Sequence, residues 1–300
     1  MPAPASIDVI HHYLRSSKRF PFVWCAGCGN GIVLGALLRA IHEVGLERDE
    51  IVMISGIGCS SRAPTYVDFN TLHTTHGRAI AFGTGVKLAK PHLHVIVVTG
   101  DGDAVAIGGN HFIHAARRNI DMTVIVFNNF IYGMTGGQYS PTTGPGDFAT
   151  TAPYGNVEKP FDVCDLAAAA GATFVARSTC YHVTHLERMI AAALKHKGFA
   201  VVDAITQCPT YYGRLNKMGG PVEMLKWQKE HFITKEQMEK LPPEEREGKW
   251  LRGILVQRDL PEYTELYEQV IRRAQERRAA GGAEEAERQC LKEKTESKSG

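Results

Sequence analysis

The sequence predicts an α/β protein with a doubly wound, mostly parallel sheet. Short apolar runs rich in β-branched residues are bounded by Gly, Asn, Asp or Cys, as buried parallel strands are. These runs span residues 51–56, 94–99, 122–128 and 200–206. Helical patterns lie between them, at residues 31–44, 79–89, 104–118 and 183–195. Because strands alternate with helices, we expect helices on both faces of one sheet.

The expected strands run into residues that are suited to binding ligands. The segments that follow them are residues 56–59, 100–103, 128–129 and 207–209. In a doubly wound fold, ligands bind beyond the carboxyl ends of the strands. We therefore expect these four segments to meet at one edge of the sheet.

The character of the chain changes after residue 212. Residues 221–232, 234–240 and 264–278 have the pattern of charged amphipathic helices, and the last twenty residues are almost all polar or charged. We expect three parts: a ligand-binding domain, a helical C-terminal extension and a disordered tail. Their expected ranges are residues 1–212, 213–280 and 281–300.

Bulk composition argues against several functional classes. Of 300 residues, 44% are hydrophobic and 22% are charged, and the formal net charge is +2. This near-neutral balance gives no reason to expect nucleic acid or a membrane surface as partner. Residues 1–22 lack the apolar segment of a secretory signal, and no run approaches the roughly 20 apolar residues of a membrane span. We expect a cytoplasmic protein whose seven cysteines serve metal or redox chemistry rather than disulfides.

A Gly-Asp-Gly-Asp segment at residues 100–103 follows an expected strand and opens a helix, and two asparagines at residues 128–129 end the next strand. A diphosphate needs a divalent ion, and Mg²⁺ prefers oxygen ligands. Asp101 can supply a carboxylate oxygen, Asn129 a carboxamide oxygen and Ile131 a main-chain carbonyl. The two glycines let the backbone approach phosphate closely, and the helix N-terminus favours an anion. The spacing therefore indicates a diphosphate and magnesium site.

Four of the cysteines lie where a metal group can bind. Cys25 and Cys28 form a CxxC pair, while Cys59 and Cys208 follow two of the expected strands. Four thiolates beside a cofactor suit a [4Fe–4S] cluster, and zinc with four cysteines is the alternative. Ligand type alone does not choose between them. We assign no function to the other three cysteines.

The sequence thus combines a strand, Gly-Asp-Gly, a helix, a second strand and Asn-Asn. This combination resembles the thiamine-diphosphate motif of decarboxylases, acetolactate-synthase-like enzymes and 2-oxoacid oxidoreductases. Further segments resemble the β subunits of 2-oxoacid:ferredoxin oxidoreductases, above all those that act on 2-oxoglutarate. These segments are residues 24–29, 55–62, 76–78, 84–89, 133–143 and 208–210. The resemblance covers about residues 22–212 and departs at Ala26, where many relatives have proline. It implies a thiamine-diphosphate-binding fold of the PP type.

The resemblance also implies the cofactors thiamine diphosphate, Mg²⁺ and a [4Fe–4S] cluster. The expected cluster ligands are Cys25, Cys28, Cys59 and Cys208. The residues expected to contact thiamine diphosphate are Ile57, Gly58, Cys59, Ser60, His76, Gly100, Asp101, Gly102, Asp103, Asn129, Gly133 and Met134.

Two residues are candidates for catalytic roles. By resemblance His76 lies near the cofactor, where a neutral imidazole can form a hydrogen bond or move a proton. The alternative for His76 is an ordinary loop histidine. Arg62 follows Cys59 by three residues and can meet a substrate carboxylate or the phosphates of coenzyme A. The alternative for Arg62 is a surface ion pair with Asp68.

The implied reaction is the oxidative decarboxylation of 2-oxoglutarate with coenzyme A to succinyl-CoA and CO₂, with reduction of ferredoxin. It is reversible, so it can also fix CO₂. The carboxylate that sets the tautomer of the aminopyrimidine is expected on a separate α subunit, in a heterodimer or a dimer of heterodimers. Pyruvate or another 2-oxoacid is the alternative substrate. Two further interpretations are a non-redox decarboxylase subunit with structural zinc and a zinc-stapled interaction module that is not an enzyme.

Overall fold

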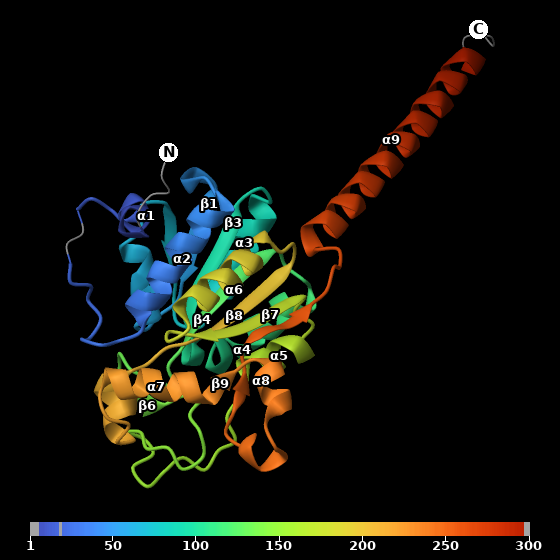
Figure 1. Cartoon of the computed structure of the whole chain (residues 1–300). Coiled ribbons are helices and arrows are strands. Elements are labelled where there is room, and N and C mark those ends of the chain that lie inside the picture. The colour runs from blue at the N-terminus through green and yellow to red at the C-terminus, as the bar shows by residue number, and fades with distance from the viewer. Residues whose placement is uncertain (1–5, 18–19, 297–300) are drawn as a thin grey trace. The chain divides into compact units, whose positions relative to one another are not determined.

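The structure, a computed structural model, describes residues 6–17 and 20–296 (Figure 1). The chain divides into two compact units, Met1–Glu262 and Tyr263–Gly300. The described part of the first unit contains a seven-stranded sheet in the order β11-β7-β8-β4-β3-β1-β2. Its strands are β1 (Ile51–Ser55), β2 (Asn70–His73), β3 (His94–Gly100), β4 (Met122–Asn128), β7 (Phe174–Thr179), β8 (Phe199–Ile205) and β11 (Gly253–Gln257). Neighbouring strands are parallel, except that β11 runs antiparallel to β7.

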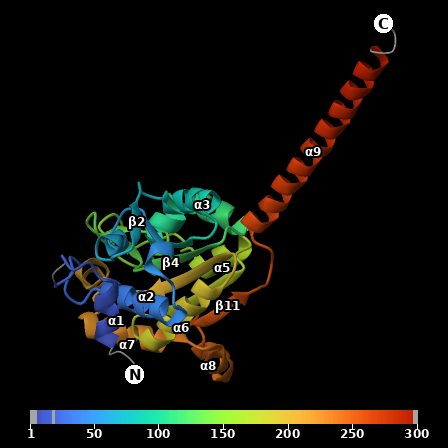
Figure 2. The ribbon, with the colours of Figure 1, turned by 90° about the horizontal axis from the view of Figure 1, so that it is seen from above.

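Helices cover both faces of this sheet, with α3 on one side and α2 and α6 on the other (Figure 2). Helices α2 and α6 pack against each other, while α4 contacts both α3 and α5. Their bounds are α2 (Asn30–Val44), α3 (Ala79–Ala89), α4 (Gly109–Arg117), α5 (Val163–Ala169) and α6 (Val183–Lys195). This is the doubly wound arrangement that the sequence predicted.

The central strands form because their side chains are buried from both sides. Every residue of β4 and β8 is buried. Ile125 and Phe127 of β4 belong to the same core cluster as α2 and α6. Successive side chains of a strand alternate between the faces, so the intervening Val124 and Val126 point toward the other helix layer. Such two-sided burial explains the continuous apolar runs in the sequence.

Shorter elements complete the described chain. Outside the central sheet, β5 pairs with β6 and β9 pairs with β10. Single turns of 3₁₀ or π type lie at Arg48–Glu50, Ser60–Thr65, Gly102–Ala106, Pro209–Gly213 and Pro243–Glu245. The remaining elements are α1 (Ser6–Tyr13), β5 (Ile131–Tyr132), β6 (Gln138–Tyr139), α7 (Pro221–His231), β9 (Phe232–Ile233), α8 (Lys235–Lys240), β10 (Trp250–Leu251) and α9 (Tyr263–Glu296). No helix in the described ranges is both long and apolar enough to cross a membrane.

The C-terminal part differs from the expected helical extension and tail. Residues 213–280 contain the strands β9, β10 and β11 as well as helices, and the first compact unit continues to Glu262 rather than ending at residue 212. The Ile254-Leu255-Val256 run of β11 supplies the apolar and β-branched residues that a strand needs. Helix α9 continues to Glu296, where we expected a disordered tail, because Ala, Glu, Arg and Lys are good helix formers. The last four residues of that expected tail lie outside the described residues.

The order of the strands places a topological switch point between β1 and β3. The chain leaves β1 toward β2 on one side and then returns to form β3 on the other side. The crevice beyond the carboxyl ends of two such strands is the usual ligand site of a doubly wound sheet. The segments at residues 56–59 and 100–103 both begin at this crevice.

Candidate cofactor site

A cavity of about 140 Å³ lies beyond the carboxyl ends of β1, β3 and β4. Every residue that the sequence assigned to thiamine diphosphate lines this cavity, and so does Ile131, the third expected magnesium ligand. The lining residues are Asn30, Ile57, Gly58, Cys59, Ser60, His76, Gly100, Asp101, Gly102, Asp103, Phe127, Asn129, Ile131, Tyr132, Gly133, Met134 and Thr135. The fold thus brings together segments that are up to about a hundred residues apart. Arg62 does not line the cavity.

The carboxylate of Asp103 joins three segments of the cavity wall. Its Oδ1 accepts hydrogen bonds from the Gly77 N–H at 2.6 Å and the Ile57 N–H at 3.4 Å, and it lies 2.6 Å from Nδ1 of His76. Its Oδ2 accepts from the Thr99 hydroxyl at 2.8 Å. Because Asp103 fixes Nδ1 of His76, Nε2 is the ring atom that can meet a ligand.

Two positions near this cavity wall require glycine, because neighbouring side chains occupy the space that a Cβ would need. A Cβ on Gly56 would lie 2.2 Å from Oδ2 of Asp103, so no side chain fits there. A Cβ on Gly102 would lie 2.2 Å from the ring of Tyr132, whose hydroxyl donates to the Gly102 carbonyl at 3.2 Å. Gly102 therefore allows close packing against Tyr132, in addition to the expected approach of a phosphate.

Asp101 is a buried carboxylate at the tip of β3. Its Oδ2 accepts hydrogen bonds from the hydroxyls of Ser140 at 2.5 Å and Thr142 at 2.7 Å. Burial raises the pKa of the carboxyl group, and the two hydroxyl donors act in the opposite direction. With the carboxamide of Asn129 and the main chain of Ile131 in the same cavity, the donor set consists of hard oxygens. Such a set fits Mg²⁺.

Cys59 and Cys208, two of the four expected cluster cysteines, border this cavity, and Cys25 and Cys28 are close enough to act on them electrostatically. A Cβ on Gly133 would lie 3.6 Å from Sγ of both Cys59 and Cys208, so these two thiols flank Gly133. The Cys28 N–H donates to the Cys25 carbonyl at 3.0 Å, which closes the CxxC turn. Burial, with added repulsion from the other thiols, raises the pKa of Cys28 to about 12 and of Cys59 to about 11. Burial therefore disfavours the ionised form of these thiols unless a positive charge lies nearby.

Arg62 lies on the surface beside the cysteines. Its side chain is exposed, and its charge acts to lower the pKa of Cys59. Asp68, the alternative partner weighed for Arg62, forms an ion pair with Arg48 at 3.0 Å. The position is compatible with an anionic ligand that approaches from outside the cavity.

Sequence reasoning missed several side chains at this site. Asn30 lines the cavity from the start of α2, and its only signal in the sequence is its place two residues after Cys28. Ser140 and Thr142 belong to a segment that carried the family resemblance, but no role was assigned to them. Tyr132 also lines the cavity and follows Asn129 by three residues.

Unpartnered buried atoms indicate that the cavity is built for a ligand. Among the described residues, three buried side-chain atoms have no hydrogen-bond partner, namely Nδ2 of Asn30 and Oγ of Ser60 and Ser61. Asn30 and Ser60 both line the cavity. An unsatisfied buried donor is costly, so these groups fit a ligand rich in acceptor oxygens, such as a diphosphate.

Comparison with known protein families identifies the class of domain that this chain contains. The family profile of the thiamine pyrophosphate enzymes, C-terminal TPP binding domain, matches residues 50–204. This range runs from β1 almost to the end of β8 and includes most of the cavity wall. The chain therefore carries a thiamine-diphosphate-binding domain.

Individual relatives then define the family. The 2-oxoglutarate synthase subunit KorB of Methanothermobacter marburgensis is 56% identical over 250 residues, which cover 83% of this chain and 87% of the relative. The 2-oxoacid:ferredoxin oxidoreductase subunit beta of Saccharolobus solfataricus is 48% identical over 63% of this chain and 62% of the relative. The chain belongs to the β subunits of the 2-oxoacid:ferredoxin oxidoreductases.

A solved structure extends the likeness to the whole fold. The 2-oxoglutarate:ferredoxin oxidoreductase of Magnetococcus marinus, solved with 2-oxoglutarate, coenzyme A and succinyl-CoA bound, superimposes with a TM-score of 0.78. The identity is 34%, and the match covers 91% of this chain and 92% of that one. The likeness therefore reaches beyond the central sheet into the C-terminal part.

Proposed function

We propose that the chain is the β subunit of an enzyme that oxidatively decarboxylates 2-oxoglutarate with coenzyme A, giving succinyl-CoA and CO₂ and reducing ferredoxin in a reversible reaction. One observation carries the proposal: the oxygen ligands around Asp101 and the thiols of Cys59 and Cys208 line or border the same cavity. On this proposal, the site of decarboxylation and the electron acceptor would be adjacent.

The donor sets agree with the proposed cofactors. Asp101, Asn129 and the Ile131 carbonyl would hold Mg²⁺ and through it the diphosphate, while the four cysteines would hold a [4Fe–4S] cluster. When bound, thiamine diphosphate supplies an electron sink for loss of CO₂, and the cluster supplies one-electron transfer.

The side chains of this chain would perform the remaining tasks. Asp103 holds Nδ1 of His76, so that Nε2 can donate to the cofactor or move a proton. Arg62 would meet the distal carboxylate of the 2-oxoacid or a phosphate of coenzyme A near the cysteines. Met134 would provide apolar contact to the cofactor at the cavity wall.

The proposed enzyme needs a partner subunit. An α subunit would supply the carboxylate that sets the tautomer of the aminopyrimidine, in a heterodimer or a dimer of heterodimers. The relatives are themselves named as subunits, which supports this arrangement. Ferredoxin would be the electron acceptor, and the complex would work in the cytoplasm.

The test is an anaerobic assay of the chain co-expressed with its α subunit. We expect a brown protein that reduces a low-potential dye with coenzyme A and 2-oxoglutarate, and more slowly with pyruvate. Asp101→Ala and Cys59→Ala should each abolish turnover, and only Cys59→Ala should also remove the cluster absorbance. A colourless protein without turnover of any 2-oxoacid would contradict the proposal, whereas faster turnover of pyruvate would correct only the substrate.

A further inference from the structure

The metal-binding carboxylate of the cavity is held by two hydroxyl groups. Oδ2 of Asp101 accepts from both Ser140 and Thr142, and all three side chains are at most 4% exposed. The two hydroxyls lie 3.0 Å apart and come from the loop after β6, some forty residues from Asp101. Both hydroxyls reach the same oxygen, Oδ2, so Oδ1 is the oxygen of Asp101 that these two donors do not occupy.

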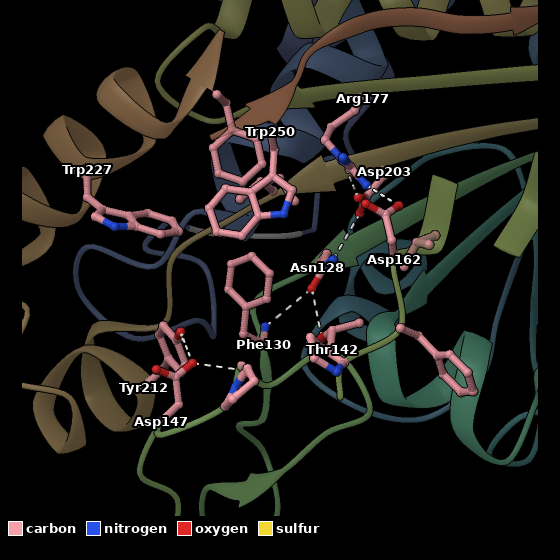
Figure 3. A pocket seen from close by; sticks show the side chains of 17 residues that line it. Asn128, Phe130, Thr142, Asp147, Asp162, Arg177, Asp203, Tyr212, Trp227 and Trp250 are labelled. Carbon is pink, nitrogen blue, oxygen red and sulfur yellow. Dashed lines mark hydrogen bonds and ion pairs between the residues drawn. The ribbon is translucent and has the colours of Figure 1, made fainter. Parts of the chain in front are cut away.

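Thr142 also lies beside a buried polar chain whose side chains line a second pocket, of about 310 Å³ (Figure 3). Its Oγ1 lies 3.2 Å from Oδ1 of Asn128, and Nδ2 of Asn128 donates to Asp203 at 3.1 Å. Arg177 donates to Asp203 at 2.9 Å and to Asp162 at 2.5 Å. Asn128, Asp203 and Arg177 hold one another through these charge-assisted bonds, whereas the single hydroxyl hydrogen of Thr142 is donated to Asp101 at 2.7 Å.

Ser140 is fixed by its own loop. The Thr142 N–H is directed at Oγ of Ser140 at 3.4 Å, and the Ser140 N–H donates to Oγ1 of Thr143 at 2.8 Å. Both hydroxyls that reach Asp101 therefore have defined directions before any ion binds.

We propose that Ser140 and Thr142 are positioning residues for the metal ion: they hold the Asp101 carboxylate in one orientation, with its second oxygen toward the cavity. The inference rests on the proposed magnesium site. Two hydroxyl donors on one oxygen restrict the rotation of the carboxylate, so its other oxygen keeps a fixed direction. Groups that orient a metal ligand in this way typically change metal affinity by roughly 10- to 100-fold when removed.

The test measures binding of Mn²⁺, a paramagnetic substitute for Mg²⁺, to the assembled α–β complex with thiamine diphosphate, by the EPR signal of the free ion. Thr142→Val removes the hydroxyl with little change in shape, and Ser140→Ala removes the other donor. We expect each to raise the Kd for Mn²⁺ about tenfold. Thr142→Ser keeps a hydroxyl and should stay within about twofold of the natural protein.

The matched control is Thr123→Val at the opposite end of the sheet. Thr123 is also buried, and its hydroxyl donates to the Ala193 carbonyl at 3.3 Å. We expect this variant to lower the Tm without changing the Kd for Mn²⁺.

The outcomes separate the two levels of the proposal. If Thr142→Val and Ser140→Ala lower the Tm as Thr123→Val does but bind Mn²⁺ normally, the two hydroxyls are merely structural and the inference is wrong. If the natural complex itself binds no Mn²⁺ with thiamine diphosphate, the metal site of the proposed function is wrong as well.

Discussion

At the residue scale, Asn30 indicates a ligand site because its buried side chain lacks a hydrogen-bond partner within the protein for its Nδ2 donor. The side chain is 1% exposed, and its Oδ1 accepts a hydrogen bond from the Thr206 hydroxyl at 3.3 Å. Its Nδ2 has no partner among the described residues. The amide is thereby held with its donor group at the cavity, where an anionic oxygen would satisfy it.

We therefore predict that Asn30→Ala weakens binding of thiamine diphosphate about tenfold, because a hydrogen bond to a charged group contributes roughly 1.5–3 kcal/mol. The free energy of unfolding without cofactor should fall by only about 1 kcal/mol, since one long bond is lost. Quenching of tryptophan fluorescence measures the Kd, and urea unfolding measures stability. Ser61→Ala is the control, because Ser61 is also unpartnered but does not line the cavity. An unchanged Kd in Asn30→Ala would mean that Nδ2 meets no cofactor atom.

The site residues that the sequence predicted are those that belong to a motif close to an expected strand. Asp101 and Cys59 follow strands directly, so a strand and the motif after it were enough to place them at one edge of the sheet. Asn30, Ser140 and Thr142 reach the cavity from segments whose positions depend on tertiary packing. Their polar side chains look like ordinary helix-start and loop residues until the fold brings them near Asp101.

At the scale of elements, β7 was missed because a charge interrupts it. Its sequence, Phe174-Val-Ala-Arg-Ser-Thr, carries Arg177 in the middle of a fully buried strand. That arginine is compensated by Asp162 and Asp203, which come from the start of α5 and from β8. A buried charge is acceptable only when it is paired, and the pairing is not readable from the strand itself.

Two histidines at the N-terminus of α6 lead us to predict that the stability of the fold depends on pH. Burial, with added repulsion from Arg252, lowers the pKa of both His182 and His185 to about 4. A histidine with a lowered pKa in the folded state stabilises the fold above its unfolded pKa, near 6.5, and this contribution is lost as the pH falls toward 4. We expect the free energy of unfolding to decline over this window.

Urea unfolding at pH 7, 6, 5 and 4 measures that decline. In the double variant His182→Asn and His185→Gln, the part of the decline that comes from these two imidazoles should disappear, so its curve should be flatter than that of the natural protein. His92→Gln, a change at an exposed histidine, should leave the curve unchanged. Parallel curves for the natural protein and the double variant would show that carboxylates alone cause the loss of stability in acid.

At the scale of the whole molecule, the two compact units differ in the residues that they contribute. All residues that line the cavity, and all four cysteines proposed to hold the cluster, lie in Met1–Glu262. In the second unit, the first three turns of α9 expose Leu266, Tyr267, Val270 and Ile271. Their spacing places them along one face of the helix, as in a helix that packs on another protein surface.

We predict that a chain ending at Glu262 retains the cofactor site but loses affinity for the α subunit. Its Tm and its Kd for thiamine diphosphate should match those of the full chain, because no cavity residue is removed. Association with the α subunit should weaken at least about tenfold, as expected when a cluster of apolar side chains leaves an interface. Light scattering after size-exclusion chromatography measures association with the α subunit. Thermal unfolding and a titration with thiamine diphosphate measure the Tm and the Kd.

A full-length variant with Leu266→Glu and Val270→Glu separates the apolar face from the length of the helix. If α9 binds through this face, the double variant should weaken assembly as much as the truncation does. If the truncation weakens assembly and the double variant does not, other residues of α9 make the contact. Unchanged assembly in both would show that the α subunit binds only Met1–Glu262, and α9 would then have no part in building the enzyme.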